Sequence, residues 1–289
     1  VLTGSQNMAL QQEISQSLAG RSVQLELLPF SLSELEAHGL ADPDPWKTLW
    51  KGGFPRLYNE DWNPTDWLPS YIQNYLERDV RQLAQVGDLG KFQVFLQLCA
   101  GRIGQLVNLT ALGNEVGVDH KTIARWLSIL EASYVVFQLR PHHANFHERL
   151  VKTPKLFFYD VGLACSILRI RSPADLDSHY LRGSLFENFA ILELVKNRMN
   201  LGERPSFWFW RDSSGHEVDL LSEEGGRLRQ VEIKASATLH SSHFDALAWF
   251  ENLAGKSLDE SHLVHAGTDT YLRKGVDVHG WKDLASLVV

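Results

Sequence analysis

Two apolar segments near the C-terminal end constrain the fold of this chain more than any other feature. Residues 217–221 and 228–233 are separated by Glu-Glu-Gly-Gly, which predicts two strands joined by a tight hairpin. Side chains alternate between the faces of a strand, so Glu232 and Lys234 are expected on one face and Ile233 in the core. The hairpin therefore commits this region to a sheet that holds charged groups at fixed positions.

Two carboxylates of this predicted hairpin, Asp219 and Glu232, can form a metal site because Asp219 can reach the same face as Glu232. They repel each other unless a cation lies between them, and oxygen ligands without Cys or His select Mg²⁺ or Mn²⁺ over zinc. Such an ion polarises a scissile phosphate and lowers the pKa of a bound water, while Lys234 orients the water or stabilises developing charge. The alternative is that these are ordinary solvated strand positions, since Glu-x-Lys alone occurs by chance in many proteins.

The order of these residues resembles a known nuclease signature. Asp219 and Glu232-x-Lys234, preceded by Glu187 on a predicted helix, look like the PD-(D/E)xK pattern of the restriction-endonuclease-like fold. The resemblance implies that Asp219, Glu232, Lys234 and Glu187 are catalytic and that Asp219, Glu232 and Glu187 bind the metal. A wider string is similar to a C-terminal domain of unknown function in bacterial and archaeal AAA-type ATPases: Gly183-x-x-Phe186-Glu187-Asn188, Trp210-Arg211, Glu217-Val-Asp219 and Glu232-Ile-Lys234.

Length and composition indicate a soluble protein of about two or more domains. The chain has 289 residues, of which 44% are hydrophobic and 22% charged. No apolar run approaches the ~20 residues that span a bilayer, and no signal sequence opens the chain, so no membrane partner is expected. Cys99 and Cys165 stand apart in apolar contexts, which predicts buried thiols in a reducing compartment. A cytoplasmic location is therefore expected.

Charge is distributed unevenly along the chain. A net charge of −7 argues against a protein that coats nucleic acid in general. Residues 1–90 nevertheless contain 6 Lys and Arg against 12 Asp and Glu, whereas residues 91–158 contain 8 against 4. One basic block in an acidic chain is a suitable surface for phosphate contacts.

The basic block also has the helix pattern of a helix-turn-helix. An apolar helix is predicted over 92–100, a short helix over 109–115 and a third helix over 120–132. The turn before the third helix contains Gly117, and Asp119 is placed to cap that helix. This order and spacing are typical of helix-turn-helix domains.

Predicted strands at 134–139 and 155–159 enclose a loop that would form the wing of a winged helix. The exposed side of the third helix carries Lys121, Thr122 and Arg125, which are the candidate DNA contacts. Because domains of this kind often bind only proteins, a protein-interaction role is the alternative.

The N-terminal segment resembles the last part of the nucleotide-binding domain in the same ATPase group. Ser5 and Gln6 match the end of a sensor strand, and Arg21 matches an arginine that faces the nucleotide. The sequence contains no Gly-x-x-x-x-Gly-Lys-Ser/Thr, whose backbone and lysine cradle phosphates. We therefore expect the C-terminal part of such an ATPase, cut or truncated within its nucleotide-binding domain. ATP would bind only in a chain that carries the missing half.

The resemblance covers essentially the whole chain and implies a multidomain α/β protein. Residues 1–30 would be the remnant of the AAA-type domain and 31–90 a helical lid. Residues 91–158 would be the winged helix, and 159–289 the restriction-endonuclease-like α/β domain.

The lid and the last domain have predicted elements of their own. They are helices over 32–40, 71–86, 163–168, 185–197, 243–253 and 281–288, and strands over 207–211, 218–222, 228–235 and 261–266. Asp160 is expected to cap the helix that follows it.

Three functions fit the sequence. The first is a Mg²⁺-dependent DNA endonuclease positioned by the winged helix and driven by an ATPase. The second is a catalytically silent DNA-binding module. The third is a protein-interaction module that acts through a partner protein or a homo-oligomer. Site chemistry, rather than fold, distinguishes them.

Overall fold

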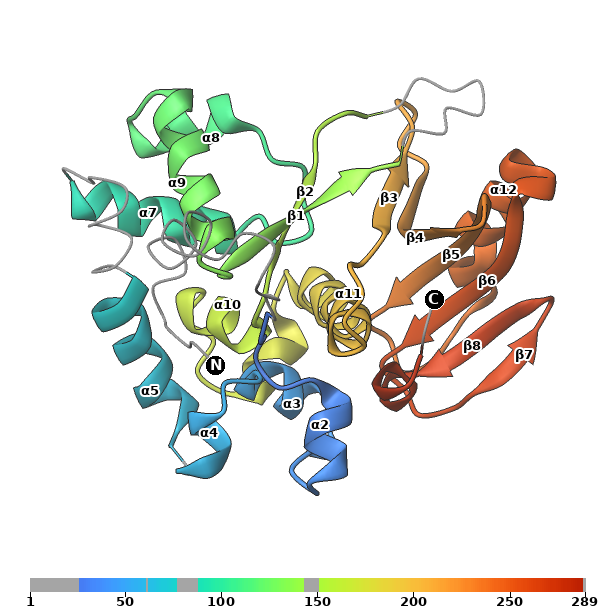
Figure 1. The fold of residues 1–289 in the computed structure, drawn as a ribbon, viewed down its shortest axis with the longest axis horizontal. Coiled ribbons are helices and arrows are strands. Elements are labelled where there is room, and N and C mark those ends of the chain that lie inside the picture. Colours follow the sequence, from blue (N-terminus) through green and yellow to red (C-terminus); the bar gives the residue numbers. More distant parts are fainter. Residues whose placement is uncertain (1–25, 61, 77–87, 143–150, 288–289) are drawn as a thin grey trace, which may run out of the picture.

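The structure is a computed structural model that describes residues 26–60, 62–76, 88–142 and 151–287, and the structural statements below concern these residues. Figure 1 shows a helical part, formed by the earlier half of the chain, beside a large sheet formed by the later half. Ser5, Gln6 and Arg21 lie outside the described residues, so their nucleotide-sensing role stays a prediction.

Short helices follow residue 30. Asn63 caps the longest, since its side-chain oxygen accepts the Thr65 N–H, and Pro64 occupies the first turn, where a missing N–H is tolerated. The helix predicted from Tyr71 therefore begins at Pro64, and its predicted part beyond Leu76 lies outside the described residues. The elements are α2 (Leu32–Ala37), α3 (Pro45–Lys51), α4 (Arg56–Asn59), α5 (Pro64–Tyr71) and the π-helical turn η1 (Ile72–Leu76).

The three helices predicted in the basic block are present. Asp119 accepts the backbone N–H groups of Lys121 and Thr122, and Gly117 ends the preceding helix with a φ of 75°. The assignment of this region to the winged-helix class stays an interpretation. The elements are α7 (Leu89–Ala100), α8 (Leu109–Val116), α9 (His120–Ala132) and the antiparallel strands β1 (Val136–Pro141) and β2 (Lys155–Phe158).

One mixed sheet of eight strands joins β1 and β2 to the C-terminal region. Its order is β2-β1-β3-β4-β5-β6-β8-β7, and β1 runs parallel to β3 through Arg140 and Pro141. The predicted hairpin between β4 and β5 is confirmed, with Gly225 and Gly226 at φ values of 60° and 80°. The strands are β3 (Phe207–Arg211), β4 (Glu217–Glu224), β5 (Arg227–Lys234), β6 (Leu258–His265), β7 (Tyr271–Arg273) and β8 (Val276–Gly280).

The C-terminal helices pack against this sheet. Asp160 caps the first of them, as predicted, by accepting the Leu163 N–H at 2.7 Å. The predicted terminal helix is a 3₁₀ segment that ends at Ala285, and the β7–β8 pair has no counterpart among the predicted strands. The helical elements are α10 (Val161–Ile167), η2 (Pro173–Ser178), α11 (Arg182–Asn200), η3 (Ser241–Phe244), α12 (Asp245–Ala254), η4 (Gly255–Ser257) and η5 (Trp281–Ala285).

The largest hydrophobic core is continuous across the predicted domain boundaries. It includes Leu32 after the N-terminal segment, Trp126 of α9, Phe158 of β2 and Ile233 of β5. Helix α11 lies centrally, because it contacts α3 and α10 on the helical side and β2 and β5 in the sheet (Figure 1). The described helices include none that is long and apolar enough to cross a membrane.

Both cysteines lie in the interior, as predicted. Cys99 and Cys165 are buried and form no disulfide. Burial raises the pKa of each thiol well above its usual range, so neither is a reactive thiolate.

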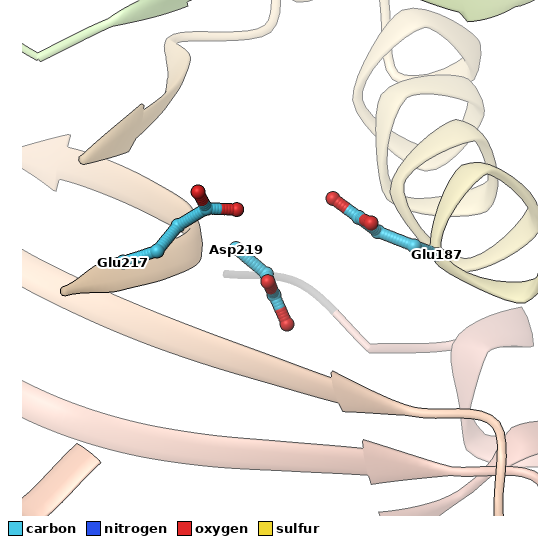
Figure 2. Close-up of side chains that lie close together, drawn as sticks. All are labelled: Glu187, Glu217 and Asp219. Carbon is cyan, nitrogen blue, oxygen red and sulfur yellow. The ribbon is translucent and has the colours of Figure 1, made fainter. Parts of the chain in front are cut away.

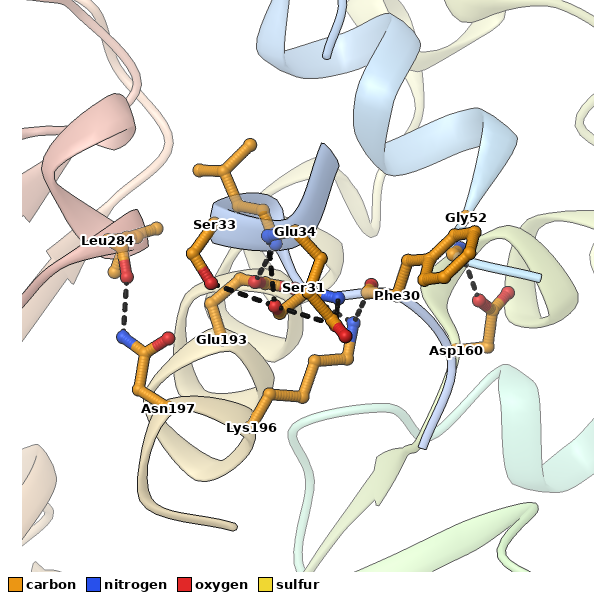
Figure 3. A network of polar contacts seen from close by, with 12 residues as sticks. Phe30, Ser31, Ser33, Glu34, Gly52, Asp160, Glu193, Lys196, Asn197 and Leu284 are labelled. Carbon is orange, nitrogen blue, oxygen red and sulfur yellow. Dashed lines mark hydrogen bonds and ion pairs between the residues drawn. The ribbon is translucent and has the colours of Figure 1, made fainter. Parts of the chain in front are cut away.

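A buried polar network anchors α11 to the start of the described chain (Figure 3). Glu193 accepts the Leu32 N–H at 2.5 Å and the Lys196 ammonium at 2.9 Å, and Lys196 also donates to the Phe30 carbonyl oxygen at 2.8 Å. The two charged side chains are only 2% and 4% exposed. Asn197 donates to a carbonyl oxygen of η5 at 2.7 Å. Buried charges require such pairing. These contacts attach α11 to the segment at Phe30 and Leu32 and also to η5.

Candidate metal centre between α11 and the β4–β5 hairpin

Three elements carry the predicted site residues. Glu187 lies in the N-terminal half of α11, Asp219 lies near the start of β4, and Glu232 and Lys234 lie at the end of β5. Leu220 pairs with Val231 in the hairpin, so Asp219 and Glu232 are the next opposed positions. The hairpin register therefore sets the two strand carboxylates side by side, as the alternation of side chains predicts.

An acidic cluster joins α11 to the start of β4. One oxygen each from Glu187, Glu217 and Asp219 lies within 4.8 Å of the others, and among the described residues Glu232 does not belong to this set. Figure 2 shows the Glu187 carboxylate pointing from α11 toward the two residues of β4. Glu217 is part of the family pattern in the sequence, but that pattern assigns it no role.

Lys155 of β2 lies inside this cluster. Its Nζ donates to Oε1 of Glu187 at 2.8 Å and also forms an ion pair with Oε1 of Glu217. The Lys155 side chain is only 3% exposed. Arg211 of β3 pairs with the second oxygen of Glu217 at 3.1 Å, so two cations hold both Glu217 oxygens.

Lys234 pairs with Glu232 on the same strand face, as alternation predicts. The Lys234 ammonium forms an ion pair with Oε1 of Glu232, whose side chain is 6% exposed. On the neighbouring strand, Oδ2 of Asp219 accepts the Ile233 N–H at 2.8 Å. The β5 backbone therefore orients Asp219, and Lys234 orients Glu232.

Burial shifts the proton affinity of these carboxyl groups. The pKa of Glu187 is raised to about 7, chiefly because burial disfavours its charge and despite the opposing Lys155. The pKa of Glu232 is raised to about 8 by burial and then by the nearby charge of Asp219. Burial also raises the pKa of Asp219 above its usual range, against the lowering effect of Lys155 and Lys234. A further positive charge among these groups would favour their ionised forms.

The two lysines remain protonated. Burial lowers the pKa of Lys155, but the carboxylates of Glu187, Asp219 and Glu217 outweigh burial and raise it well above its usual range. In the same way, Glu232 and Asp219 raise the pKa of Lys234 against the effect of burial. Both side chains therefore act as fixed cations and not as proton acceptors.

Three carboxylate oxygens keep coordination capacity. Among the described residues, no hydrogen-bond or ion-pair partner engages Oε2 of Glu187, Oδ1 of Asp219 or Oε2 of Glu232. Gly104, at a φ of 72°, leaves space beside this Glu187 oxygen, since a Cβ there would lie 3.1 Å from it. Carboxylate oxygens of this kind fit a hard divalent cation such as Mg²⁺ or Mn²⁺.

The candidate DNA contacts lie elsewhere, on α9. This helix packs against β1, on the side of the sheet order away from β4 and β5 (Figure 1). Lys121 and Arg125 are exposed, whereas the Thr122 hydroxyl donates to the Asp119 cap at 2.8 Å. The structure thus separates these residues from the carboxylate cluster.

Part of the charge of the basic block is neutralised internally. Lys155 is buried in the carboxylate cluster, and Arg102 of the α7–α8 loop pairs with Glu115 of α8. Lys91 donates to the Gly117 carbonyl oxygen at 2.9 Å and so supports the turn between α8 and α9. The surface available to phosphate is therefore less positive than the sequence count indicates.

The role of Lys155 is one that sequence reasoning missed. The available signal was a lysine at the head of Lys155-Leu-Phe-Phe, a segment otherwise apolar enough for a fully buried strand. A lysine is almost never fully buried unless it is paired, so its position in such a strand indicates an acidic partner elsewhere in the chain.

Three parts of the sequence match known families. Residues 1–36 match a family described as an AAA domain. Residues 43–174 match a domain of unknown function (DUF8612), and residues 182–284 match a second domain of unknown function (DUF4143). The second of these segments contains Lys155, and the third contains the carboxylates.

Similar proteins occur in bacteria and archaea. The chain is 30% identical over 243 residues to the uncharacterized protein Rv2008c of Mycobacterium tuberculosis, covering 82% of this chain and 52% of the relative. It is 23% identical over 248 residues to an uncharacterized protein of Haemophilus influenzae, covering 81% and 58%. It is 21% identical over 241 residues to the uncharacterized protein MJ1544 of Methanocaldococcus jannaschii, covering 76% and 52%.

The chain spans about half the length of the curated relatives that it matches. Its first 36 residues carry the AAA match, and the two domains of unknown function together cover most of the remainder. By these matches the first 36 residues are similar to an AAA domain, and the chain as a whole is similar to bacterial and archaeal proteins.

Proposed function

We propose that the C-terminal part of this chain is a Mg²⁺- or Mn²⁺-dependent nuclease site within an AAA-ATPase-like protein. The observation that carries the proposal is the set of oxygens on Glu187, Asp219 and Glu232 that have no partner among the described residues, next to Lys234. A divalent cation promotes hydrolysis of a phosphodiester by neutralising charge on the phosphate and activating a bound water. The buried Glu232, the half-buried Glu187 and Asp219, and one adjacent ammonium supply the residues for that chemistry.

Each residue has a distinct part in this proposal. Glu187, Asp219 and Glu232 would hold the ion, which supplies Lewis acidity and lowers the pKa of a bound water. Lys234 remains protonated beside Glu232, so it would stabilise negative charge on the phosphate and would not take a proton from the water. The hydrogen bond from the Ile233 N–H would keep Asp219 in position during the reaction.

DNA is the proposed substrate, and α9 would contact its backbone. Lys121 and Arg125 are both exposed on the helix that follows the Asp119 cap. Lysine and arginine side chains on such a helix bind phosphates without regard to sequence. The two sites would therefore bind one nucleic acid at separate places.

Cleavage by site variants tests the nuclease proposal. Asp219→Asn should abolish Mg²⁺-dependent cleavage of plasmid and single-stranded DNA, because it removes one charged ligand. Lys234→Ala should keep metal binding but lose cleavage, and Glu187→Gln should be intermediate. Glu224→Gln is the matched control, since Glu224 lies at the exposed end of the same strand as Asp219, and this variant should cleave like the wild type.

A catalytically silent module is the second candidate. The internal ion pairs of Lys155 and Lys234 favour it, because they already compensate much of the acidic charge. Wild-type protein that cuts no DNA in Mg²⁺ or Mn²⁺, and whose Tm does not rise with either ion, would exclude the nuclease proposal. A DNA-binding or protein-interaction role would then remain.

A further inference from the structure

The position of Lys155 has a consequence for the number of ions that the proposed site can hold. Sites that use two divalent ions place them about 3.5–4 Å apart, bridged by carboxylates. Here Glu187 and Glu217 are bridged by the Lys155 ammonium, through one oxygen of each. The lysine therefore occupies the space between these two carboxylates that a second ion would need.

Both oxygens of Glu217 are paired with cationic side chains. Its Oε1 pairs with Lys155, and its Oε2 pairs with Arg211 at 3.1 Å. Glu187, in contrast, gives only Oε1 to Lys155 and keeps Oε2 without a partner among the described residues. Glu187 therefore keeps an oxygen that is not paired with a cation, whereas Glu217 keeps none.

The formal charges agree with a single ion. When all four carboxyl groups are ionised, as a bound cation favours, they and three cationic side chains leave one negative charge in the site. One divalent ion changes this to one positive charge, which matches the single negative charge of a phosphodiester, whereas a second ion leaves two further charges without partners. The carboxylates are Glu187, Glu217, Asp219 and Glu232, and the cations are Lys155, Arg211 and Lys234.

We propose that Lys155 is a positioning residue that permanently replaces a second metal ion, so that the site binds one divalent cation through Glu187, Asp219 and Glu232. This inference is based on the proposed function. Lys155 is buried, with its Nζ 5.5 Å from the centroid of the Phe209 ring, so it cannot swing out to admit another ion without disrupting the packing. Because β2 carries Lys155, the site is complete only when the β1–β2 pair joins the sheet beside β3.

Counting bound Mn²⁺ tests this proposal. The full chain, freed of metal with EDTA and dialysed, is titrated with Mn²⁺ by calorimetry and by the electron paramagnetic resonance of free Mn²⁺. The wild type should bind one ion, and Lys155→Met should bind two, because its Glu187 and Glu217 oxygens are released. Lys152→Met is the matched control, since Lys152 is exposed three residues earlier, and it should still bind one ion.

The rise in Tm on adding Mn²⁺ is a second measurement. If Lys155 had only a structural role, its replacement would lower the Tm without changing this rise. Lys155→Met should have a lower Tm than wild type in EDTA, and Mn²⁺ should raise its Tm more than it raises that of wild type. Lys155→Arg should keep a stoichiometry of one, because it retains the charge. If Lys155→Met does not fold, the number of Mn²⁺ ions bound by the wild type and by Lys155→Arg still tests whether the site holds one ion.

The outcomes separate this inference from the proposed function. A wild type that binds two ions, or a folded Lys155→Met with the stoichiometry and Mn²⁺ response of the wild type, would overturn the role of Lys155 alone. A wild type that binds no Mn²⁺ would overturn the metal site itself and the inference with it.

Discussion

The carboxyl groups of Glu187 and Glu232 take up protons near neutral pH because they are buried close to one another and to Asp219. Their pKa values of about 7 and about 8 exceed the usual 4.5 of a glutamic acid, which the unfolded chain would show. Between these limits the folded protein binds more protons than the unfolded one. The stability that these groups contribute is therefore present at pH 4.5 and is lost as the pH rises through about 8.

This linkage predicts a pH-dependent difference between wild type and Glu187→Gln in EDTA. Near pH 5 the two proteins should have similar Tm values, because Glu187 is protonated in the folded state. By pH 8 the variant should be the more stable, since it cannot acquire the buried charge, and each unit of pKa shift corresponds to roughly 1.4 kcal/mol. The measurement is Tm at several pH values in EDTA. A Tm difference that does not change with pH would contradict this description of Glu187.

Helix α11 connects two buried charge networks. Glu187 in its N-terminal half belongs to the carboxylate cluster, whereas Glu193 and Lys196 bind the backbone of Phe30 and Leu32 (Figure 3). The rigid rise of a helix fixes the spacing between these networks. Any displacement of the segment around Phe30, where the AAA match lies, is therefore opposed by contacts on the helix that carries Glu187.

Helix α9 provides the prediction at the scale of elements. Lys121→Ala combined with Arg125→Ala should weaken DNA binding and flatten its salt dependence, by roughly 1 logarithmic unit of slope for each phosphate that is no longer bound. Both side chains are exposed, so folding should be preserved. The measurement is DNA affinity at several salt concentrations, with Ser128→Ala, at an exposed uncharged position of the same helix, as the control. A folded double variant with the wild-type slope would support the protein-interaction alternative.

At the scale of the molecule, the sequence predicted what depends on local pattern. The Glu-Glu-Gly-Gly turn and the alternation around Glu232 predicted the β4–β5 hairpin and the opposition of Asp219 and Glu232, and the Asp119 cap predicted α9. In each case a few neighbouring residues determine the structure. Local rules of this kind apply without knowledge of the remaining chain.

What the sequence did not predict depends on contacts between distant segments. The role of Lys155 requires β1 to pair with β3, which lies more than sixty residues further along the chain at Phe207–Arg211. The β7 strand has only three residues, Tyr271 to Arg273, and a partly exposed pattern that carries little periodicity. The apolar pattern after Trp281 predicts a helix as far as residue 288, although only a short 3₁₀ segment forms there.

The most direct test of the metal centre is the anomalous diffraction of Mn²⁺ in crystals of the full chain soaked with the ion. The proposal predicts one Mn²⁺ peak within coordination distance of oxygens of Glu187, Asp219 and Glu232, with Lys155 still bound to Glu217. Crystals of Asp219→Asn should lack that peak. The absence of Mn²⁺ from wild-type crystals, or a peak held by Glu217 in place of Lys155, would contradict this account.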